Sequence, residues 1–236
     1  MKRIGIIGAM DSEVDNLIAR MDNPTQQEYA GRRFVSGQLA GQDVVVVKSG
    51  IGKVAAAITA QMLVDRFQVT ALLNTGMAGG LDKRLAVKDL VVATGALQHD
   101  FDLTAFGHVR GYLSGDDDQK PTIFPCDTTL IERAMDVAKT VLPAGSKAIT
   151  GTVASGDIFV DDSGLKVQLR DGFGCAAAEM EGAAIAQAAV ANGIPFVILR
   201  TISDLAEQKA NVSFDEMERY AGQLASDITT ALLATL

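Results

Sequence analysis

Carboxylate side chains stand at the ends of three apolar segments that the sequence predicts as core strands. Four acids take these positions: Glu13, Glu179, Glu181 and Asp204. Ligands of α/β sheets bind at the carboxyl ends of strands, so we expect these acids to share one rim. Carboxylates crowded at one site raise one another's pKa, which is the tuning that acid–base catalysis requires.

Each acid taken alone has a simpler interpretation. An acid that follows a strand often opens a helix, where the macrodipole stabilises negative charge near the N-terminal N–H groups. Met77 and Phe159 also follow predicted strands, and Phe159 alone would fit plain core packing equally well. The residue types therefore leave both a catalytic rim and a set of structural residues open.

Two glycine motifs do not carry phosphate or dinucleotide chemistry. Lys53 follows a glycine, but Val54 stands where a Walker A loop has Ser or Thr. Gly5 and Gly8 lack the rest of the dinucleotide fingerprint. Neither segment predicts a nucleotide-phosphate site.

Metal ligation has one candidate, formed by His99, Asp100 and Asp102, and a hydrogen-bonded structural cluster is the alternative for it. The chain has only two histidines, and its two cysteines, Cys126 and Cys175, are far apart without CxxC spacing. The sequence therefore favours a protein without a metal and without a disulfide framework.

The elements that must position the acids alternate between strands and helices. Strands are predicted over 4–8, 34–39, 43–48, 71–75, 90–93, 149–155, 175–179 and 195–201. Helices are predicted over 12–21 with Ser12 as N-cap, 53–67, 128–141, 181–192 and from Phe214 to Leu232, with an irregular stretch at 107–125. This order predicts a single α/β domain over residues 1–236, built on a mixed, mostly parallel sheet.

Length and charge exclude several classes of protein. A chain of 236 residues can bury a sizeable core without disulfides or a metal. Its net charge of −8 does not suit nucleic acid or an anionic membrane surface. The apolar runs are far shorter than the ~20 residues of a membrane span, and the opening residues read as a strand and not a signal peptide, so we expect a cytoplasmic protein.

Seven segments, in order, carry a family resemblance: GIIGAMDSEV, SGIGKVAAA, NTGMAGG, HDFDLTAFG, SGDIFV, AEMEGAAIA and RTISD. Together they resemble the methylthioadenosine/S-adenosylhomocysteine nucleosidases of the nucleoside phosphorylase superfamily. The resemblance runs nearly end to end and weakens at 107–125 and in the last helix. It implies a three-layer α/β/α sandwich that hydrolyses the glycosidic C–N bond of an adenine thionucleoside with no metal and no organic cofactor.

The resemblance assigns two catalytic carboxyl groups. Asp204 matches the acid that protonates purine N7, with Ser203 beside it to orient it, and such an acid must keep its proton near neutral pH. Glu13 matches the base that accepts a proton from the attacking water. Two carboxyl groups that flank a sugar with an oxocarbenium-like transition state follow the logic of inverting glycosidases.

The resemblance also implies a binding site completed by a second chain. Around the ribose and adenine it places Met77, Phe159, Val160, Glu179, Met180, Glu181 and Arg200. Phe159 matches the ring that stacks on adenine, and Glu181 matches the carboxylate that binds the ribose hydroxyls. Arg200 matches a basic residue that organises the carboxylates around the water. The apolar 5′-thio pocket would be lined by Met10, Ile51 and Phe214 and, from a neighbouring subunit, Leu103 and His108. The implied assembly is a homodimer.

Two residues depart from the family pattern. Met77 replaces the usual serine, and a thioether donates no hydrogen bond to ribose or water. His108 replaces a common aromatic residue, which leaves the preferred 5′ substituent open.

Two other functions compete with hydrolysis. A nucleoside phosphorylase would need cationic or neutral groups around phosphate, but the sequence offers Glu13 and Met77 there. A non-catalytic nucleoside binder on the same scaffold would have no reason to keep both an acid and a base.

Overall fold

A 10-stranded mixed sheet forms the centre of the molecule. The computed structural model describes residues 3–115, 117–205 and 214–236, without the side chains of 214 and 215. The strands are β1 (Ile4–Gly8), β2 (Asp22–Tyr29), β3 (Arg32–Leu39), β4 (Gln42–Lys48), β5 (Ala71–Gly80), β6 (Leu90–Gln98), β7 (Phe124–Pro125), β8 (Ala148–Ser155), β9 (Cys175–Glu179) and β10 (Phe196–Leu205).

The sheet closes on itself at one end. Its order is β10-β6-β8-β9-β5-β1-β4-β3-β2, and β5 also pairs with β10. β5 is parallel to β10 and to β1, and antiparallel to β9. The ends of β5, β9 and β10 are therefore held next to one another, and these are the strands that carry most of the predicted site.

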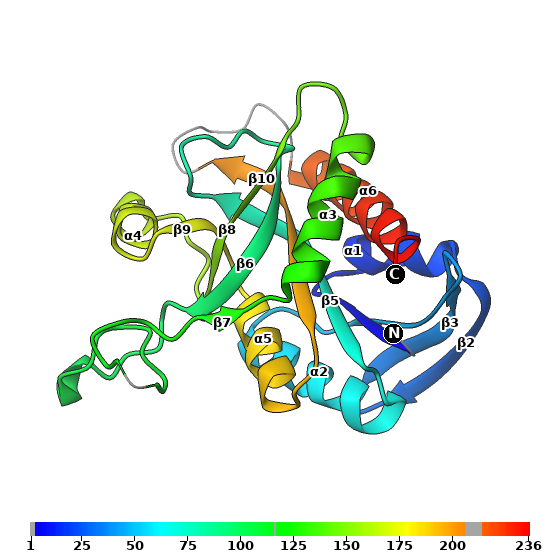
Figure 1. The fold of residues 1–236 in the computed structure, drawn as a ribbon, viewed down its shortest axis with the longest axis horizontal. Coiled ribbons are helices and arrows are strands. Elements are labelled where there is room, and N and C mark those ends of the chain that lie inside the picture. The colour runs from blue at the N-terminus through cyan, green and yellow to red at the C-terminus, as the bar shows by residue number, and fades with distance from the viewer. Residues whose placement is uncertain (1–2, 116, 206–213) are drawn as a thin grey trace.

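Helices cover both faces of the sheet, so that the molecule has three layers with the sheet in the middle (Figure 1). One cluster packs α1 (Asp11–Ala19), α3 (Thr128–Val141) and α6 (Phe214–Leu233) against the sheet, and another packs α2 (Lys53–Phe67) and α5 (Gly182–Ala191) on the opposite face. The short helix α4 (Ser163–Val167) and a π-helical turn at Gln168–Gly172 lie beside β9. The α/β/α architecture agrees with the predicted fold class.

Burial on both faces explains why the strands are almost continuously apolar. In β4, Val44 and Val46 pack with α1 and α6, whereas Val45 and Val47 pack with α2. All four valine side chains are fully buried. Successive strand residues point to opposite faces, so a strand between two helical layers needs apolar residues at every position.

Helices α2 and α3, strand β9 and the β3–β4 hairpin confirm the sequence prediction closely. The prediction for the first helix was wrong at its ends: Met10, not Ser12, is the N-cap, and the helix stops at Ala19. Ser12 lies inside the first turn and its hydroxyl donates to Glu218 Oε1 in α6 at 2.7 Å.

The sequence prediction missed β2 and α4 and cut three strands short. β2 is an edge strand whose residues are all exposed, so it lacks the apolar alternation that reveals a strand. β5, β6 and β10 each continue beyond the predicted ends, through Gly80, Gln98 and Leu205. The glycine-rich segment 76–80 and the Ser203–Asp204 pair are therefore strand residues held by pairing between β5 and β10.

Candidate active site

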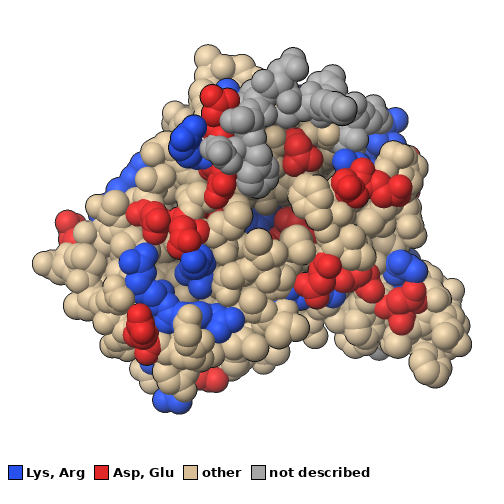
Figure 2. Space-filling view, turned by 180° about the vertical axis from the view of Figure 1, so that it is seen from behind, with Lys and Arg blue, Asp and Glu red and all other residues tan. Residues whose placement is uncertain are grey.

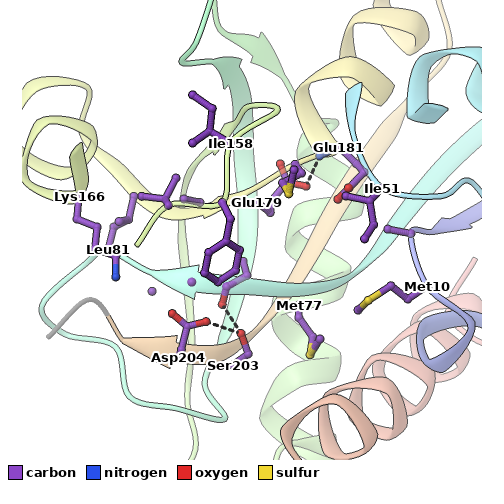
Figure 3. Close-up of a pocket in the computed structure, with 18 of the residues that line it drawn as sticks. Met10, Ile51, Met77, Leu81, Ile158, Lys166, Glu179, Glu181, Ser203 and Asp204 are labelled. Carbon is purple, nitrogen blue, oxygen red and sulfur yellow. Dashed lines mark hydrogen bonds between the residues drawn. The ribbon is translucent and has the colours of Figure 1, made fainter. Parts of the chain in front are cut away.

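A cavity of about 190 Å³ opens where β5, β9 and β10 end, beside the start of α1 and α2. Eleven residues predicted from the sequence line it: Met10, Glu13, Ile51, Met77, Phe159, Val160, Glu179, Met180, Glu181, Ser203 and Asp204. In Figure 3, Ser203 and Asp204 lie at one end, Met10 and Ile51 at the other, and Met77 between them. The fold thus brings the four acids of the predicted rim to one cavity.

Glu13 lies in the first turn of α1 with its carboxylate held by backbone N–H groups. Oε2 accepts from Ala9 N at 2.5 Å and from Met10 N at 3.1 Å, and Oε1 accepts from Met77 N at 3.0 Å. Burial raises the pKa of Glu13, and the nearby Arg200 guanidinium and the three N–H groups oppose that rise only in part. Glu13 is therefore a fixed, buried carboxyl group that exchanges a proton more readily near neutral pH than an exposed one.

Two glycines allow Glu13 to approach the sheet this closely. A Cβ at Gly8 would lie 2.8 Å from the Glu13 Cβ. A Cβ at Gly76 would overlap Glu13 Oε1 and lie 2.5 Å from Arg200 Nη1. Neither position has room for a side chain, so a glycine at the end of β1 and another in β5 serve the site directly.

Arg200 of β10 lies behind the carboxylates and does not line the cavity. It is 1% exposed, and its Nη2 donates to Asn74 Oδ1 at 2.6 Å and to Glu179 Oε2, and lies 3.8 Å from Glu181 Oε2. A buried guanidinium among carboxylates offsets charge that would otherwise be desolvated without compensation. This position agrees with the predicted role of Arg200 in organising the carboxylates. It does not agree with direct contact between Arg200 and a ligand in the cavity.

Glu179 is fully engaged by its own surroundings. Its carboxylate accepts from Ser155 Oγ, from the backbone N–H groups of Glu181 and Gly182, and from Arg200. Both carboxylate oxygens of Glu179 are used by these hydrogen bonds. Although Glu179 borders the cavity, its carboxylate therefore holds the neighbouring residues in place.

Glu181 precedes α5, and its Oε1 accepts from Gly52 N at the start of α2 at 2.9 Å. Burial and the neighbouring Glu179 carboxylate raise the pKa of Glu181 to about 7, against the attraction of Arg200. This carboxyl group therefore changes charge close to neutral pH.

Asp204 owes its orientation to an irregularity in β10. Ile202 pairs with Ala78 and Asp204 with Gly79, so Ser203 is an extra residue between them. Such a bulge turns side chains that regular pairing would place elsewhere. Ser203 Oγ donates to Asp204 Oδ2 at 2.8 Å, as the dashed line in Figure 3 shows, and so orients the carboxyl group. Asp204 is the last residue but one of β10.

Apolar side chains make up the rest of the predicted wall. Ile51 and Phe159 are 61% and 68% exposed, although both are large and hydrophobic. Exposed apolar groups that gather at a cavity mark a binding site for a ligand or another chain.

Besides Arg200, three predicted residues are not in the described cavity wall. Leu103 and His108 lie on the segment after β6, where the His108 ring stacks on Tyr112 at 4.7 Å and its Nδ1 lies 3.5 Å from Asp118 Oδ2. Phe214 opens α6, and its side chain lies outside the described part of the chain.

The sequence analysis missed Ile158, Leu81 and Lys166, which also line the cavity. Lys166 comes from α4, where Asp162 is the N-cap and accepts from Leu165 N at 2.7 Å. The Asp162-Ser-Gly-Leu spacing was the available signal for this short helix.

The residues singled out as a metal candidate serve other contacts. Asp100 pairs with Lys53, and Asp102 pairs with Arg110, at 2.6 and 2.7 Å. Within residues 3–115, 117–205 and 214–236, no group of three or more His, Cys, Asp or Glu side chains is arranged to hold a metal ion. In the same residues no helix is both long and apolar enough to cross a membrane.

Comparison with known proteins agrees with this geometry. The family model of the phosphorylase superfamily matches residues 3–235. A 5′-methylthioadenosine/S-adenosylhomocysteine nucleosidase of Shewanella sediminis is 43% identical over 99% of this chain and 100% of its own length.

Two solved structures of nucleosidases with the same name are close in fold. The enzyme of Colwellia psychrerythraea in complex with adenine has a TM-score of 0.91 and 41% identity, covering 100% of this chain and 96% of that one. The enzyme of Neisseria meningitidis in complex with methylthio-immucillin-A has a TM-score of 0.91 and 38% identity, with full coverage of both chains. The chain therefore belongs to the phosphorylase superfamily and, within it, to the family of 5′-methylthioadenosine/S-adenosylhomocysteine nucleosidases.

Proposed function

We propose that this protein hydrolyses the N-glycosidic bond of 5′-methylthioadenosine and S-adenosylhomocysteine, releasing adenine and a 5-thioribose product. The observation that carries the proposal is the meeting of Glu13, Glu181 and Asp204 at one largely apolar cavity. Adenine and methylthio-immucillin-A bound to relatives support the same ligand class. Such a reaction would serve methionine salvage and the removal of a methyl-transfer by-product.

Asp204 acts as the general acid in this proposal. Adenine leaves poorly as an anion, so a proton must reach the purine, at N7, while the C–N bond lengthens. The Ser203 hydroxyl donates a hydrogen bond to Oδ2 of Asp204, which leaves Oδ1 free to face the adenine ring. The small residue Gly79 beside Oδ1 leaves space for the purine edge.

Glu13 acts as the general base. Its raised pKa makes it a stronger proton acceptor than an exposed glutamate, which suits the activation of water. The N–H groups of Ala9, Met10 and Met77 fix its orientation before substrate arrives, so little reorganisation is needed in the transition state.

The sugar lies between these two groups, held by Glu181 and packed against Met180. The Glu181 carboxylate, fixed on one oxygen by Gly52 N, can accept from ribose hydroxyls with the other. Met77 contributes its thioether to the wall and its N–H to Glu13, so the departure from serine leaves the link to the base intact.

The two ends of the substrate are recognised by apolar surfaces. Phe159 stacks on adenine, which contributes about 1 kcal/mol beyond its buried area, and Val160 offers backbone groups to the purine edge. Met10, Ile51 and Phe214 surround the 5′-thio substituent.

A phosphate-free assay separates this reaction from phosphorolysis. We expect adenine release from methylthioadenosine in phosphate-free buffer, with no acceleration when phosphate is added, because the carboxylates of the cavity repel phosphate. A rate that depends on phosphate, with ribose 1-phosphate as product, would refute hydrolysis.

We further propose a homodimer in which the partner subunit completes the 5′ end of the site. The support is the exposure of large apolar side chains: Ile51, Val54 and Ile58 at the start of α2 are 61%, 69% and 43% exposed, and Phe106, on the segment after β6, is 79% exposed. Leu103 and His108 lie beside Phe106 in the chain and would reach the partner's cavity. A fully active monomer in sedimentation velocity at assay concentration would contradict this assembly.

We propose that residues 1–236 act as one nucleosidase domain, and a cytoplasmic location stays a prediction.

A further inference from the structure

A closed ring of hydrogen bonds joins Lys53, Asp100 and Asp157 outside the cavity wall. Lys53 N donates to Asp157 Oδ1 at 2.8 Å, and Asp157 N donates to Asp100 Oδ2 at 2.8 Å. Lys53 Nζ closes the ring on Asp100 Oδ1 at 2.6 Å. The three residues come from the start of α2 and from the segments that follow β6 and β8, and none of them lines the cavity.

We propose that Asp100 and Asp157 are positioning residues that fix the adenine-stacking segment and the ribose-binding carboxylate relative to each other. This inference rests on the proposed function. In it, the Lys53–Asp100–Asp157 ring holds the adenine subsite and the ribose subsite at a fixed distance and orientation.

The ring reaches the ribose subsite through the start of α2. Gly52 N donates to Glu181 Oε1, and the next N–H, of Lys53, donates to Asp157. The first N–H groups of a helix have no partner within the helix, so two adjacent donors are free to hold two carboxylates from distant segments. A shift of Asp157 therefore moves the donor that holds Glu181.

Gly52 shows how closely the two segments are fitted. Its φ is +98°, a left-handed conformation that favours glycine, and a Cβ there would lie 3.0 Å from Asp157 Oδ1. A side chain at this position would both strain the backbone and displace the Asp157 carboxylate.

The ring reaches the adenine subsite through the residues next to Asp157. Ile158 and Phe159 follow it directly and are 50% and 68% exposed. Packing therefore does little to place this part of the cavity wall. The two hydrogen bonds of Asp157 are the contacts that anchor it to the segments of Lys53 and Asp100.

The ion pair at the base of the ring is shielded from water. The side chains of Lys53 and Asp100 are each 15% exposed, so their attraction is screened less than that of a surface pair. Burial raises the pKa of Asp100, but hydrogen bonds from Lys53 and Asp157 N outweigh that effect and hold the pKa below its usual value. Lys53 Nζ also donates to Gln98 Oε1 at 3.1 Å, and Gln98 Nε2 donates to Gln187 Oε1 in α5 at 2.7 Å. The ring is thereby tied to the helix that follows Glu181.

The test compares Asp157→Ala with Asp157→Asn. Alanine removes the acceptor for Lys53 N, and we expect kcat/KM for methylthioadenosine to fall about tenfold, mostly through KM. Asparagine keeps an oxygen at the same place and should restore kcat/KM to within about twofold of wild type. Asp161→Ala is the matched control, since Asp161 is an exposed acid on the same segment whose side chain makes no hydrogen bond or ion pair with the described residues, and it should leave both constants unchanged.

Calorimetric titration with adenine gives a second readout at one subsite. Asp157→Ala and Asp100→Ala should both weaken adenine binding about tenfold. The melting temperature should stay near that of the wild type for Asp157→Ala and fall for Asp100→Ala, which leaves Lys53 without its ion-pair partner. Unchanged kcat/KM and adenine affinity in a folded Asp157→Ala protein would overturn the proposal, as would an Asn variant as impaired as the Ala variant. A wild-type protein that binds adenine but releases none from methylthioadenosine would refute the proposed function alone, and the adenine titrations would still decide the positioning role.

Discussion

Carboxyl groups that lie near cations have their pKa values shifted in opposite directions in two regions of the molecule. The buried cluster consists of Glu13, Glu179 and Glu181 in the cavity wall and Arg200 behind them, and all four side chains are almost fully buried. The outer arm is the segment 101–123 after β6, where Asp102 pairs with Arg110 at 2.7 Å and Asp117 with Lys120 at 2.9 Å, all at least 38% exposed.

Burial accounts for the difference. In the buried cluster, loss of water raises the pKa of Glu13 and Glu181 despite the nearby guanidinium. In the outer arm, hydrogen bonds from Thr104 and Lys120 lower the pKa of Asp102 and Asp117, because little desolvation opposes them. The presence of a nearby cation therefore does not decide whether a carboxyl group can exchange a proton at neutral pH, because burial can outweigh it.

Figure 2 shows acidic and basic side chains interspersed over much of one face of the molecule. Exposed charges of this kind keep a protein in solution but contribute little to stability pair by pair. In the proposed reaction, by contrast, the carboxyl groups that act are the ones gathered at the cavity.

The largest effect should follow the loss of the acid. Asp204→Asn can still donate a hydrogen bond but cannot transfer a proton, so turnover of methylthioadenosine should fall by about 10²–10⁴. Adenine binding by calorimetry and the melting temperature should stay near wild type. An Asp204→Asn protein with normal turnover would remove this residue from the mechanism.

Glu13→Gln should reduce turnover by a similar or slightly smaller factor. The amide keeps the size of the side chain but cannot accept the proton of water, so kcat should fall about 10²-fold or more while KM changes little. In the wild type, kcat/KM should decline on acidification through an apparent pKa above the usual glutamate value, because burial raises the pKa of Glu13. An acid limb at the usual value would contradict the desolvation of the buried cluster.

Glu181→Gln should increase stability at pH 8. The carboxyl group has a pKa of about 7 in the folded protein, against 4.5 as its ordinary value. The folded state therefore holds the proton more tightly, and the stability that this contributes is present below pH 4.5 and lost as pH rises through 7. Removal of the charge should raise the free energy of unfolding at pH 8 by on the order of 1–3 kcal/mol and leave it unchanged below pH 4.5. Urea unfolding at both pH values measures this, and a loss of stability at pH 8 would show that the hydrogen bond from Gly52 outweighs desolvation.

Asp102→Asn in the outer arm should have the smallest effect. Its ion pair with Arg110 is solvent-exposed, so we expect no measurable change in urea unfolding at either pH. A clear loss of stability or of catalytic rate would mean that the outer arm is buried in the assembled protein, as the proposed dimer requires of its neighbours Leu103 and His108.

How much of this structure the sequence determines differs from element to element. Strands with both faces covered, such as β1 and β9, and amphipathic or alanine-rich helices, such as α2 and α3, follow from local apolar patterns. β2 could not be predicted in this way, because its polar sequence forms a strand only through pairing with β3. Likewise the segment 76–80 is extended because β10 lies beside it.

For the site, the sequence motifs were enough to predict which residues gather, since eleven predicted residues line one cavity. The orientation and burial of each side chain depend on the three-dimensional fold. Arg200 lies behind the carboxylates because its strand pairs with β5. Asp204 faces the cavity because a bulge shifts the register of β10. Lys166 lies on a short helix that no apolar pattern in the sequence predicts. The physical reason is that a side chain's direction and desolvation depend on strands and helices distant in the sequence, whereas its chemical type does not.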